Sequence, residues 1–374
     1  MPQATTLPAS YLAQFSEQPG YLNFASYGPP SRDVLATSAQ LMADAAAGAV
    51  GTADKLHAED LRARAAFARL VGFDLDNVTL LPATAYGLMQ LAFGVGGKVL
   101  VSAGEFPANV YPWLRAQQAG VGEVAFMGGA RKMVTPELVA ASLTQEITAV
   151  AVSAVDFQTG YRADLAGIRD VMGPHRLLLV DGIQGFAAVD QDWSMADAVA
   201  VGSQKWVRGG WGAGAMAFSD AGLERIKPVL GSWTGVENPT SYDGLPHEPR
   251  RDALKFNVSN LSPFATGAFA SALELIEEAG IDAIAASIAA TTGVLIEKLE
   301  GAGVDILSPL EASQRAGIVV AGFPTGNAAE AHTALALAGI SATLHGSQRI
   351  RLSAHATTDN ETLSHAALIL AGFA

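Results

Sequence analysis

The amino-acid sequence predicts an α/β fold in which helices cover a mostly parallel sheet, followed by a smaller α+β C-terminal domain. Short apolar runs such as Leu177-Leu178-Leu179-Val180 alternate with helical patterns over most of the chain. Uninterrupted apolar runs are typical of strands buried on both faces of a sheet. Toward the C-terminus, long helices and a few short strands replace this alternation. We therefore expect a large domain at residues 16–258 and a small domain at 259–374, which also takes in residues 1–15.

The composition excludes several classes of function. The 374 residues include 23 lysines and arginines and 36 acidic residues, and this net charge of -13 argues against binding to nucleic acid or to an anionic membrane. The chain has no cysteine, which removes disulfides, thiolate metal sites and cysteine nucleophiles. The seven histidines show no His-Glu-x-x-His spacing, so we expect no metal. With no apolar run of about 18 residues and no leader-like N-terminus, we expect a cytoplasmic protein.

The first strand leads to a candidate phosphate site. A strand expected at 77–81 breaks at Pro82-Ala83-Thr84, and a helix from Ala85 to Phe93 follows. The backbone amides at the start of this helix, together with the Thr84 hydroxyl, are suited to receive a phosphate at the positive end of the helix dipole. A plain helix N-cap is the alternative interpretation of Thr84.

The segment after this helix continues the alternation of strands and helices. Gly94-Val95-Gly96-Gly97-Lys98 lacks the glycine spacing and the Ser or Thr of a phosphate loop, so we interpret it as a turn. A strand at 99–102 leads to Glu105-Phe106-Pro107-Ala108-Asn109-Val110-Tyr111-Pro112-Trp113, where a core aromatic is the simplest interpretation of Phe106. A strand at 148–155 and a helix at 164–172 follow.

Two charged residues stand at the ends of buried strands. Asp181 follows Leu177-Leu178-Leu179-Val180, and Lys205 follows Ala198-Val199-Ala200-Val201 after a short polar turn. Partial desolvation lowers the pKa of a lysine and makes its neutral amine available as a nucleophile. A strand-end lysine that extends to solvent is the alternative. An aspartate and a lysine at neighbouring strand ends fit pyridoxal 5'-phosphate, with the lysine for an imine and the aspartate for the pyridine nitrogen.

A pair of arginines near the C-terminus is a candidate carboxylate site. Arg349 and Arg351 alternate along an expected strand and so point to one face of it. A guanidinium group is able to hold a carboxylate through two parallel hydrogen bonds. Exposed strand arginines are common, so this pattern alone does not decide between a site and a solvated strand.

These segments resemble a known family. VDGIQ at 180–184, SQKW at 203–206 and GGWGAG at 209–214 are similar to the corresponding motifs of aminotransferase class V, a branch of the fold-type I pyridoxal phosphate-dependent enzymes that includes kynureninases and cysteine desulfurases. The resemblance covers about residues 20–370 and implies a seven-stranded, mostly parallel sheet. The sequence departs from the family pattern at Gln204, where the family usually has histidine, and it lacks the desulfurase cysteine.

The resemblance implies a role for each matching residue. Lys205 and Asp181 would be catalytic, and the segment that opens the chain would line the site. Arg351, in the sequence Arg-Leu-Ser-Ala-His, would hold the α-carboxylate of the substrate. Asn260, with Ser259, replaces a Gly-Thr pair that reaches the cofactor phosphate of the neighbouring subunit, which implies a homodimer with shared active sites. The residues expected around the cofactor are Ala83, Thr84, Ala85 and Ser203 at the phosphate, Phe106 on the ring face, Gln184 at the ring hydroxyl, and Asp181, Gln204 and Lys205.

The expected activity is transamination between a small amino acid and a keto acid. A carbon–sulfur or carbon–carbon β-lyase, or a kynureninase-like hydrolase, using the same site is the alternative, and a non-catalytic binding protein on this fold is a third. Phe157 stands where desulfurase relatives have asparagine, and an aromatic residue there is more typical of the kynureninase and general aminotransferase branches. We favour transamination.

Overall fold

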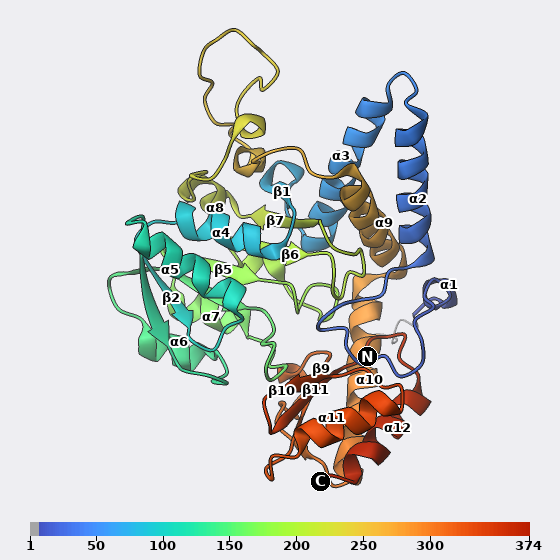
Figure 1. Ribbon diagram of the computed structural model, residues 1–374. Coiled ribbons are helices and arrows are strands. Elements are labelled where there is room, and N and C mark those ends of the chain that lie inside the picture. The colour runs from blue at the N-terminus through green and yellow to red at the C-terminus, as the bar shows by residue number, and fades with distance from the viewer. Residues whose placement is uncertain (1–6) are drawn as a thin grey trace, which may run out of the picture.

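The computed structural model describes residues 7–374 and contains two sheets (Figure 1). The larger sheet has seven strands in the order β1-β7-β6-β5-β4-β2-β3, and only β7 runs antiparallel to its neighbours. The expected seven-stranded, mostly parallel sheet is therefore confirmed. Its strands are β1 (Val78–Leu81), β2 (Lys98–Ser102), β3 (Glu123–Met127), β4 (Ile147–Ser153), β5 (Leu177–Asp181), β6 (Ala198–Gly202) and β7 (Gly214–Phe218).

The larger sheet is buried on both faces because successive residues of its strands point into two different apolar clusters. In β5, Leu178 and Val180 join one cluster, whereas Leu177 and Leu179 join the other. Helices from each side complete the two clusters. The first face is covered by α3 (Thr52–Val71), α6 (Pro136–Ser142), α7 (Leu165–Met172) and α9 (Pro263–Ala279), and the second by α4 (Thr84–Gly94) and α5 (Tyr111–Gln118). This two-sided burial explains why the strands read as uninterrupted apolar runs.

The smaller sheet is antiparallel throughout and has the order β10-β11-β9-β8. A separate apolar cluster joins it to three helices. The elements of this unit are α10 (Ile281–Gly301), β8 (Asp305–Ile306), β9 (Ile318–Gly322), α11 (Ala328–Leu337), β10 (Thr343–His345), β11 (Arg349–Ser353) and α12 (Asn360–Ala371). The smaller α+β unit expected at the C-terminus is thus present.

Segments from the two ends of the chain meet across the expected domain boundary. Asn23 forms a bridge with Ser353, so the N-terminal segment pairs with the smaller sheet. Helix α9 packs with α2 (Arg32–Ala47) and α3 against the larger sheet. The boundary at residue 258 remains a prediction. Helix α9 follows this residue, which assigns it to the small domain, but it packs with the large one. Of the N-terminal stretch assigned to the small domain, residues 1–6 lie outside the described residues.

The remaining elements are short, apart from one long loop. They are α1 (Ala9–Leu12), α8 (Asp220–Arg225) and the short helical turns at Leu75–Asn77, Pro107–Asn109, Trp193–Met195, Trp233–Gly235, Ala253–Phe256 and Ala312–Gln314. The loop between Gly235 and Ala253 extends away from the larger sheet (Figure 1). Among residues 7–374 no single helix is long and apolar enough to cross a membrane, although α9 and α10, bent by 82° at their junction, pass that test together by length and composition alone.

Candidate active site

The carboxyl ends of the parallel strands collect the polar residues of the candidate site at one edge of the larger sheet. Parallel strands end at the same edge, where open α/β sheets bind ligands. Asp181 is the last residue of β5, and Lys205 lies in the turn after β6. The other residues expected here follow three further strands: Thr84 after β1, Phe106 after β2 and Phe157 after β4.

Asp181 is almost completely buried, with 2% of its surface exposed. One carboxylate oxygen accepts a hydrogen bond of 3.0 Å from the backbone amide of Ile183. Burial raises the pKa of the Asp181 carboxyl to about 6, while the Ile183 amide and the nearby charge of Lys205 act in the opposite direction. A cationic ring nitrogen placed against this carboxylate would favour its ionised form further.

Lys205 combines burial with a cationic neighbour. Burial lowers the pKa of its amine to about 8; the charge of Arg351 lowers it too, whereas that of Asp181 raises it. With such a pKa, roughly a tenth of the amine is neutral at pH 7, far more than for an ordinary lysine. Its Nζ atom lies 5.5 Å from the centroid of the Phe106 ring. The structure therefore brings Lys205, Asp181 and Phe106 to the same sheet edge; their catalytic and cofactor roles remain predictions.

The start of α4 offers an unpartnered hydroxyl. The Oγ1 atom of Thr84 is buried and has no hydrogen-bond partner among the described residues. A Cβ atom at Gly202 would lie 2.6 Å from this Oγ1 and 2.6 Å from Oε1 of Gln204, so the glycine lets both side chains approach the end of β6. The N-cap interpretation of Thr84 is wrong: Ala83 is the N-cap, without a side-chain cap, and Thr84 is the first helical residue. Its hydroxyl is consequently free to bind an anion, together with the amides at Thr84 and Ala85.

Other expected cofactor contacts are already engaged within the protein. The Ser203 hydroxyl donates a hydrogen bond to the Gly210 carbonyl, so contact with a phosphate requires it to turn away. The Gln184 amide donates to the Ala25 carbonyl at 2.9 Å and accepts from the Trp206 indole at 2.8 Å, which leaves one amide hydrogen for a ring hydroxyl. Their cofactor roles remain predictions, as does that of Asn260, which is exposed just before α9.

Arg351 is the residue of the smaller sheet that faces the site. It lies on β11, is 4% exposed, and its guanidinium donates to the Ser26 hydroxyl at 2.8 Å, the Phe157 carbonyl at 3.2 Å and the Thr343 hydroxyl at 3.2 Å. Its Nε atom is buried without a partner in the described chain. Burial lowers the pKa of Arg351 to about 10, so the side chain stays charged at neutral pH. Ser26, from the N-terminal segment, thus faces the site, as the resemblance implied.

Glu105 is a buried acid near the site that the sequence does not mark. Its carboxyl group is buried and accepts a hydrogen bond of 3.0 Å from the Ser153 amide, and it also bonds the Ser153 hydroxyl. Burial raises the pKa of Glu105 to about 7, and the charges of Asp181 and Asp156 add to this effect. Ser153 pairs with Asp181 across β4 and β5, so the buried acid adjoins the strand that carries Asp181. An acid before an aromatic residue gives no local sign of such burial.

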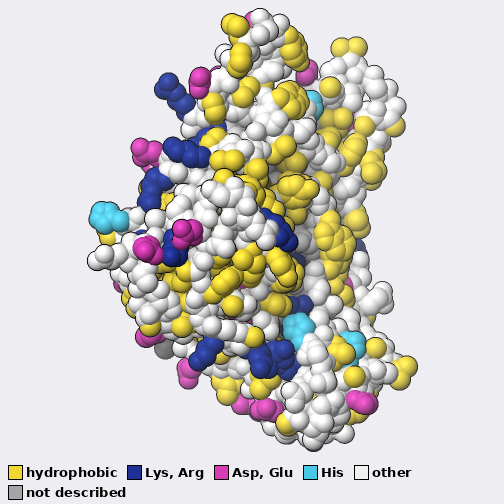
Figure 2. Space-filling model, turned by 60° about the vertical axis from the view of Figure 1, so that its left-hand side comes forward, with side chains coloured by type: hydrophobic (Ala, Val, Ile, Leu, Met, Phe, Trp, Pro, Cys, Tyr) yellow, Lys and Arg dark blue, Asp and Glu magenta, His cyan; other side chains and the backbone are white. Residues whose placement is uncertain are grey.

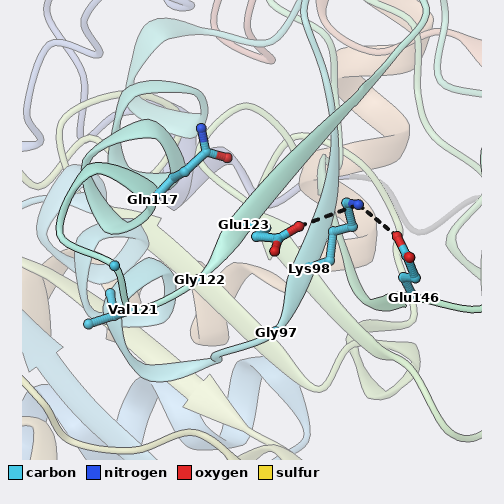
Figure 3. Close-up of a pocket in the computed structure, with 8 residues that line it drawn as sticks. Gly97, Lys98, Gln117, Val121, Gly122, Glu123 and Glu146 are labelled. Carbon is cyan, nitrogen blue, oxygen red and sulfur yellow. Dashed lines mark hydrogen bonds and ion pairs between the residues drawn. The ribbon is translucent and has the colours of Figure 1, made fainter.

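A large cavity lies elsewhere and plays no part in this arrangement. It measures about 710 Å³ and is lined by the end of α5, the turn before β3, and residues at the beginnings of β2, β3 and β4, on the sheet edge opposite the candidate site. Lys98 forms ion pairs there with Glu123 at 3.4 Å and Glu146 at 2.8 Å (Figure 3). The single lysine is thus fully paired with carboxylates, and the Gly97-Lys98 segment enters a strand, not the helix that a phosphate loop requires.

Comparison with known proteins decides the family. Residues 63–361 match the family model Aminotransferase class-V. The chain belongs to this family. Curated relatives include an uncharacterized aminotransferase of Bacillus subtilis, 25% identical over 59% of this chain, and a kynureninase of Eremothecium gossypii, 27% identical over 66%. A probable cysteine desulfurase of Aeropyrum pernix is 26% identical over 67%. The aligned segments cover 60–65% of the length of these relatives.

Solved structures of similar fold extend over nearly the whole chain. A mutant of C-DES with glycine covalently linked to the pyridoxal phosphate cofactor matches with a TM-score of 0.87 at 20% identity, covering 96% of this chain and 97% of that one. A cysteine desulfurase of Thermococcus onnurineus matches with a TM-score of 0.82 at 16% identity, covering 94% of each chain. These matches confirm the fold-type I architecture.

Aminotransferase class V is a family of pyridoxal phosphate-dependent enzymes, and the residues of this chain fit that cofactor. The unpartnered Thr84 hydroxyl and the amides beside it suit the phosphate, and Asp181 suits the ring nitrogen. Phe106 presents an aromatic face near the Lys205 amine. These features lie at one sheet edge, which supports a single binding site for the group.

Proposed function

We propose that this protein is an aminotransferase that moves the amino group of a small amino acid to a keto acid. The observation that carries the proposal is a chain of contacts: the Lys205 amine lies over the Phe106 ring, Phe106 meets Phe157, and the Phe157 carbonyl accepts a hydrogen bond from Arg351. Asp181 ends β5, the strand beside the one that leads to Lys205. The site thus combines a nucleophilic amine, a carboxylate for the cofactor ring and a guanidinium for the substrate carboxylate. A binding protein would not need the amine.

Each residue has a distinct task in this reaction. Pyridoxal phosphate, when bound, supplies an electron-withdrawing ring that stabilises negative charge at the substrate α-carbon. Arg351 holds the α-carboxylate and so sets which α-carbon bond is presented for cleavage. Lys205 takes the proton from the α-carbon of the amino acid in the first half-reaction. In the second half-reaction it gives a proton to the α-carbon derived from the keto acid. An amine with a pKa near 8 serves as base and as acid near neutral pH.

Gln204 leaves Lys205 without an imidazole partner. His355, which stacks on Trp206, is fully buried, and burial lowers its pKa well below the usual value. His345 on β10 has a pKa lowered to about 4 by burial and by the charges of Arg351 and Arg349. Both imidazoles are therefore in their uncharged form at neutral pH. Lys205 is therefore the group that we assign to proton transfer.

A half-reaction tests the proposal. Protein saturated with pyridoxal phosphate is mixed with single amino acids and no keto acid, and the cofactor absorbance and released ammonia are followed. Transamination leaves the cofactor in its amine form until a keto acid is added. Sustained release of ammonia and a keto acid from a β-substituted amino acid, with no accumulation of the amine form, would instead identify a lyase. The variant Lys205→Ala serves as the control that removes proton transfer.

We also propose a homodimer with shared active sites. Large aromatic side chains next to the site are exposed: Trp211 is 68% and Tyr86 61% exposed, and Trp211 stacks on Tyr27 with ring centroids 4.3 Å apart. Figure 2 shows hydrophobic side chains gathered over the middle of one face. Exposed aromatic clusters of this kind mark interaction surfaces. A monomeric mass in solution at full activity would rule out the dimer.

A cytoplasmic location is also part of our proposal.

A further inference from the structure

A second arginine, Arg349, lies beside Arg351, and its side chain has no hydrogen-bond or ion-pair partner in the described part of the chain. Arg349 is two residues away on β11, so both side chains leave the same face of the strand. Arg349 is half-buried, and among residues 7–374 its side chain has neither a hydrogen bond nor an ion pair within the protein. Its Nη1 atom is buried and unpartnered. A half-buried cation that makes no ion pair is costly unless a ligand completes it.

The charged groups around Arg349 leave it cationic. Asp156 is the acid that acts on it, but an oxygen of that carboxylate already accepts from the Gln158 amide and from the amide and hydroxyl of Thr159. A further charged neighbour is Arg131, which is exposed and also basic. In a chain with a net charge of -13, this local excess of positive charge is unusual. Figure 2 shows Lys or Arg side chains beside a histidine in the lower half of the face.

The aromatic wall of the site extends from Lys205 toward Arg349. The Phe106 ring, near the Lys205 amine, meets Phe157 edge to face at 5.1 Å, and Phe157 meets His345 at 6.1 Å. His345 is the cross-strand partner of Arg349. The wall therefore connects the reacting centre with the second arginine. Two positions along a strand are separated by roughly 7 Å, a spacing that suits two carboxylates joined by a short carbon chain.

We propose that Arg349 binds a second anionic group at the end of the substrate side chain, so that the enzyme selects short amino acids with an acidic side chain. This inference rests on the proposed function, in which Arg351 holds the α-carboxylate. A charge-assisted contact of this kind changes affinity by about ten- to hundredfold. A neutral side chain of equal size would leave the Arg349 guanidinium unpaired and would bind less tightly.

Matched ligands and variants test the site. Succinate and butyrate are titrated by calorimetry into protein saturated with pyridoxal phosphate, and the half-reaction is compared for glutamate against glutamine and aspartate against asparagine. We expect succinate to bind at least about tenfold more tightly than butyrate and the acidic amino acids to be preferred. Arg349→Gln should abolish both preferences and leave the affinity for butyrate unchanged. Arg225→Gln, at the opposite edge of the sheet, should retain them.

The outcomes separate this inference from the proposed function. Equal affinity for succinate and butyrate in the wild type, or an equal loss for both ligands in Arg349→Gln, overturns the anion site. Reaction of neutral amino acids without an acidic preference also overturns it but leaves the proposed function standing. If succinate is preferred through Arg349 and no amino acid alters the cofactor spectrum, the anion site stands and the proposed function fails.

Discussion

The backbone amide of Gly28 donates a hydrogen bond of 2.8 Å to the carbonyl oxygen of Gln204, the residue before Lys205. A Cβ atom at position 28 would lie only 1.9 Å from the Lys205 carbonyl oxygen. The N-terminal segment therefore lies directly against the turn that carries the reactive amine. This contact joins a segment that pairs with the smaller sheet to the end of β6 in the larger one.

The variant Gly28→Ala should displace the Lys205 turn. A methyl group cannot be accommodated at 1.9 Å from a backbone oxygen, so one of the two segments must move. We expect the protein to stay folded by circular dichroism and to lose at least about tenfold in affinity for pyridoxal phosphate, measured by absorbance titration. Gly301→Ala, where the added Cβ meets nothing within 4 Å, is the matched control. Wild-type cofactor affinity in Gly28→Ala would show that the turn tolerates the shift.

The variant Thr84→Val should weaken cofactor binding without destabilising the cofactor-free protein. The Thr84 hydroxyl is buried without a partner, so its removal should leave the stability of the cofactor-free protein unchanged or raise it by about 1 kcal/mol. Affinity for pyridoxal phosphate should nevertheless fall about tenfold, because the phosphate loses a donor. Thr84→Ser should restore binding. A parallel loss of stability and affinity would point to a packing role instead.

The sequence could predict the residues that contrast with their immediate neighbours. Asp181 and Lys205 are charged groups at the ends of apolar strands, and Arg351 alternates with Ile350 and Leu352 in its strand, so each is visible against its immediate neighbours. The uninterrupted apolar strands likewise indicate a sheet covered on both faces. The sequence predicts a helix start at Ala85, one residue late, because Ala83, which has no capping side chain, serves as the N-cap.

The sequence could not predict contacts that arise only from tertiary packing. Ser26 meets Arg351 across 325 positions of the chain, and no local pattern marks that serine. Glu105 depends on Ser153 in another strand for its buried environment. The Ser203 hydroxyl is engaged by Gly210 because the glycine-rich segment folds back on itself, which spacing alone does not reveal.

The variant Glu105→Gln should change how stability depends on pH. The folded protein holds the Glu105 proton up to a pKa of about 7, whereas the unfolded chain releases it near 4.5, so this group makes the wild type less stable as pH rises through that interval. An amide at this position can accept from the Ser153 backbone and donate to the Ser153 hydroxyl, so the variant keeps both hydrogen bonds without a titrating proton.

The expected difference between the two proteins therefore grows with pH. Near pH 4.5 they should be equally stable, and near pH 8 the variant Glu105→Gln should be more stable by up to about 3 kcal/mol. Denaturant unfolding of both cofactor-saturated proteins at a series of pH values measures this difference. A difference that stays constant across the series would show that Glu105 does not titrate in this interval.

The buried ion pair between Arg208 and Glu17 should be the strongest single link between the N-terminal segment and the Lys205 turn. The two side chains are 2% and 11% exposed and lie 2.6 Å apart. The Arg208 guanidinium also donates to the Pro29 carbonyl and lies 3.5 Å from the centroid of the Phe15 ring. Its other contacts thus hold the guanidinium in place, and Glu17 supplies the counter-charge.

Removing the charge of Glu17 leaves this buried cation unpaired, which typically costs several kcal/mol. We expect Glu17→Gln to lower the free energy of unfolding by about 2–4 kcal/mol. The matched control is Glu277→Gln, which breaks the exposed pair with Arg69 and should cost about 0.5 kcal/mol or less. Equal effects of the two substitutions in denaturant unfolding would mean that the buried pair is solvated and contributes no more than a surface one.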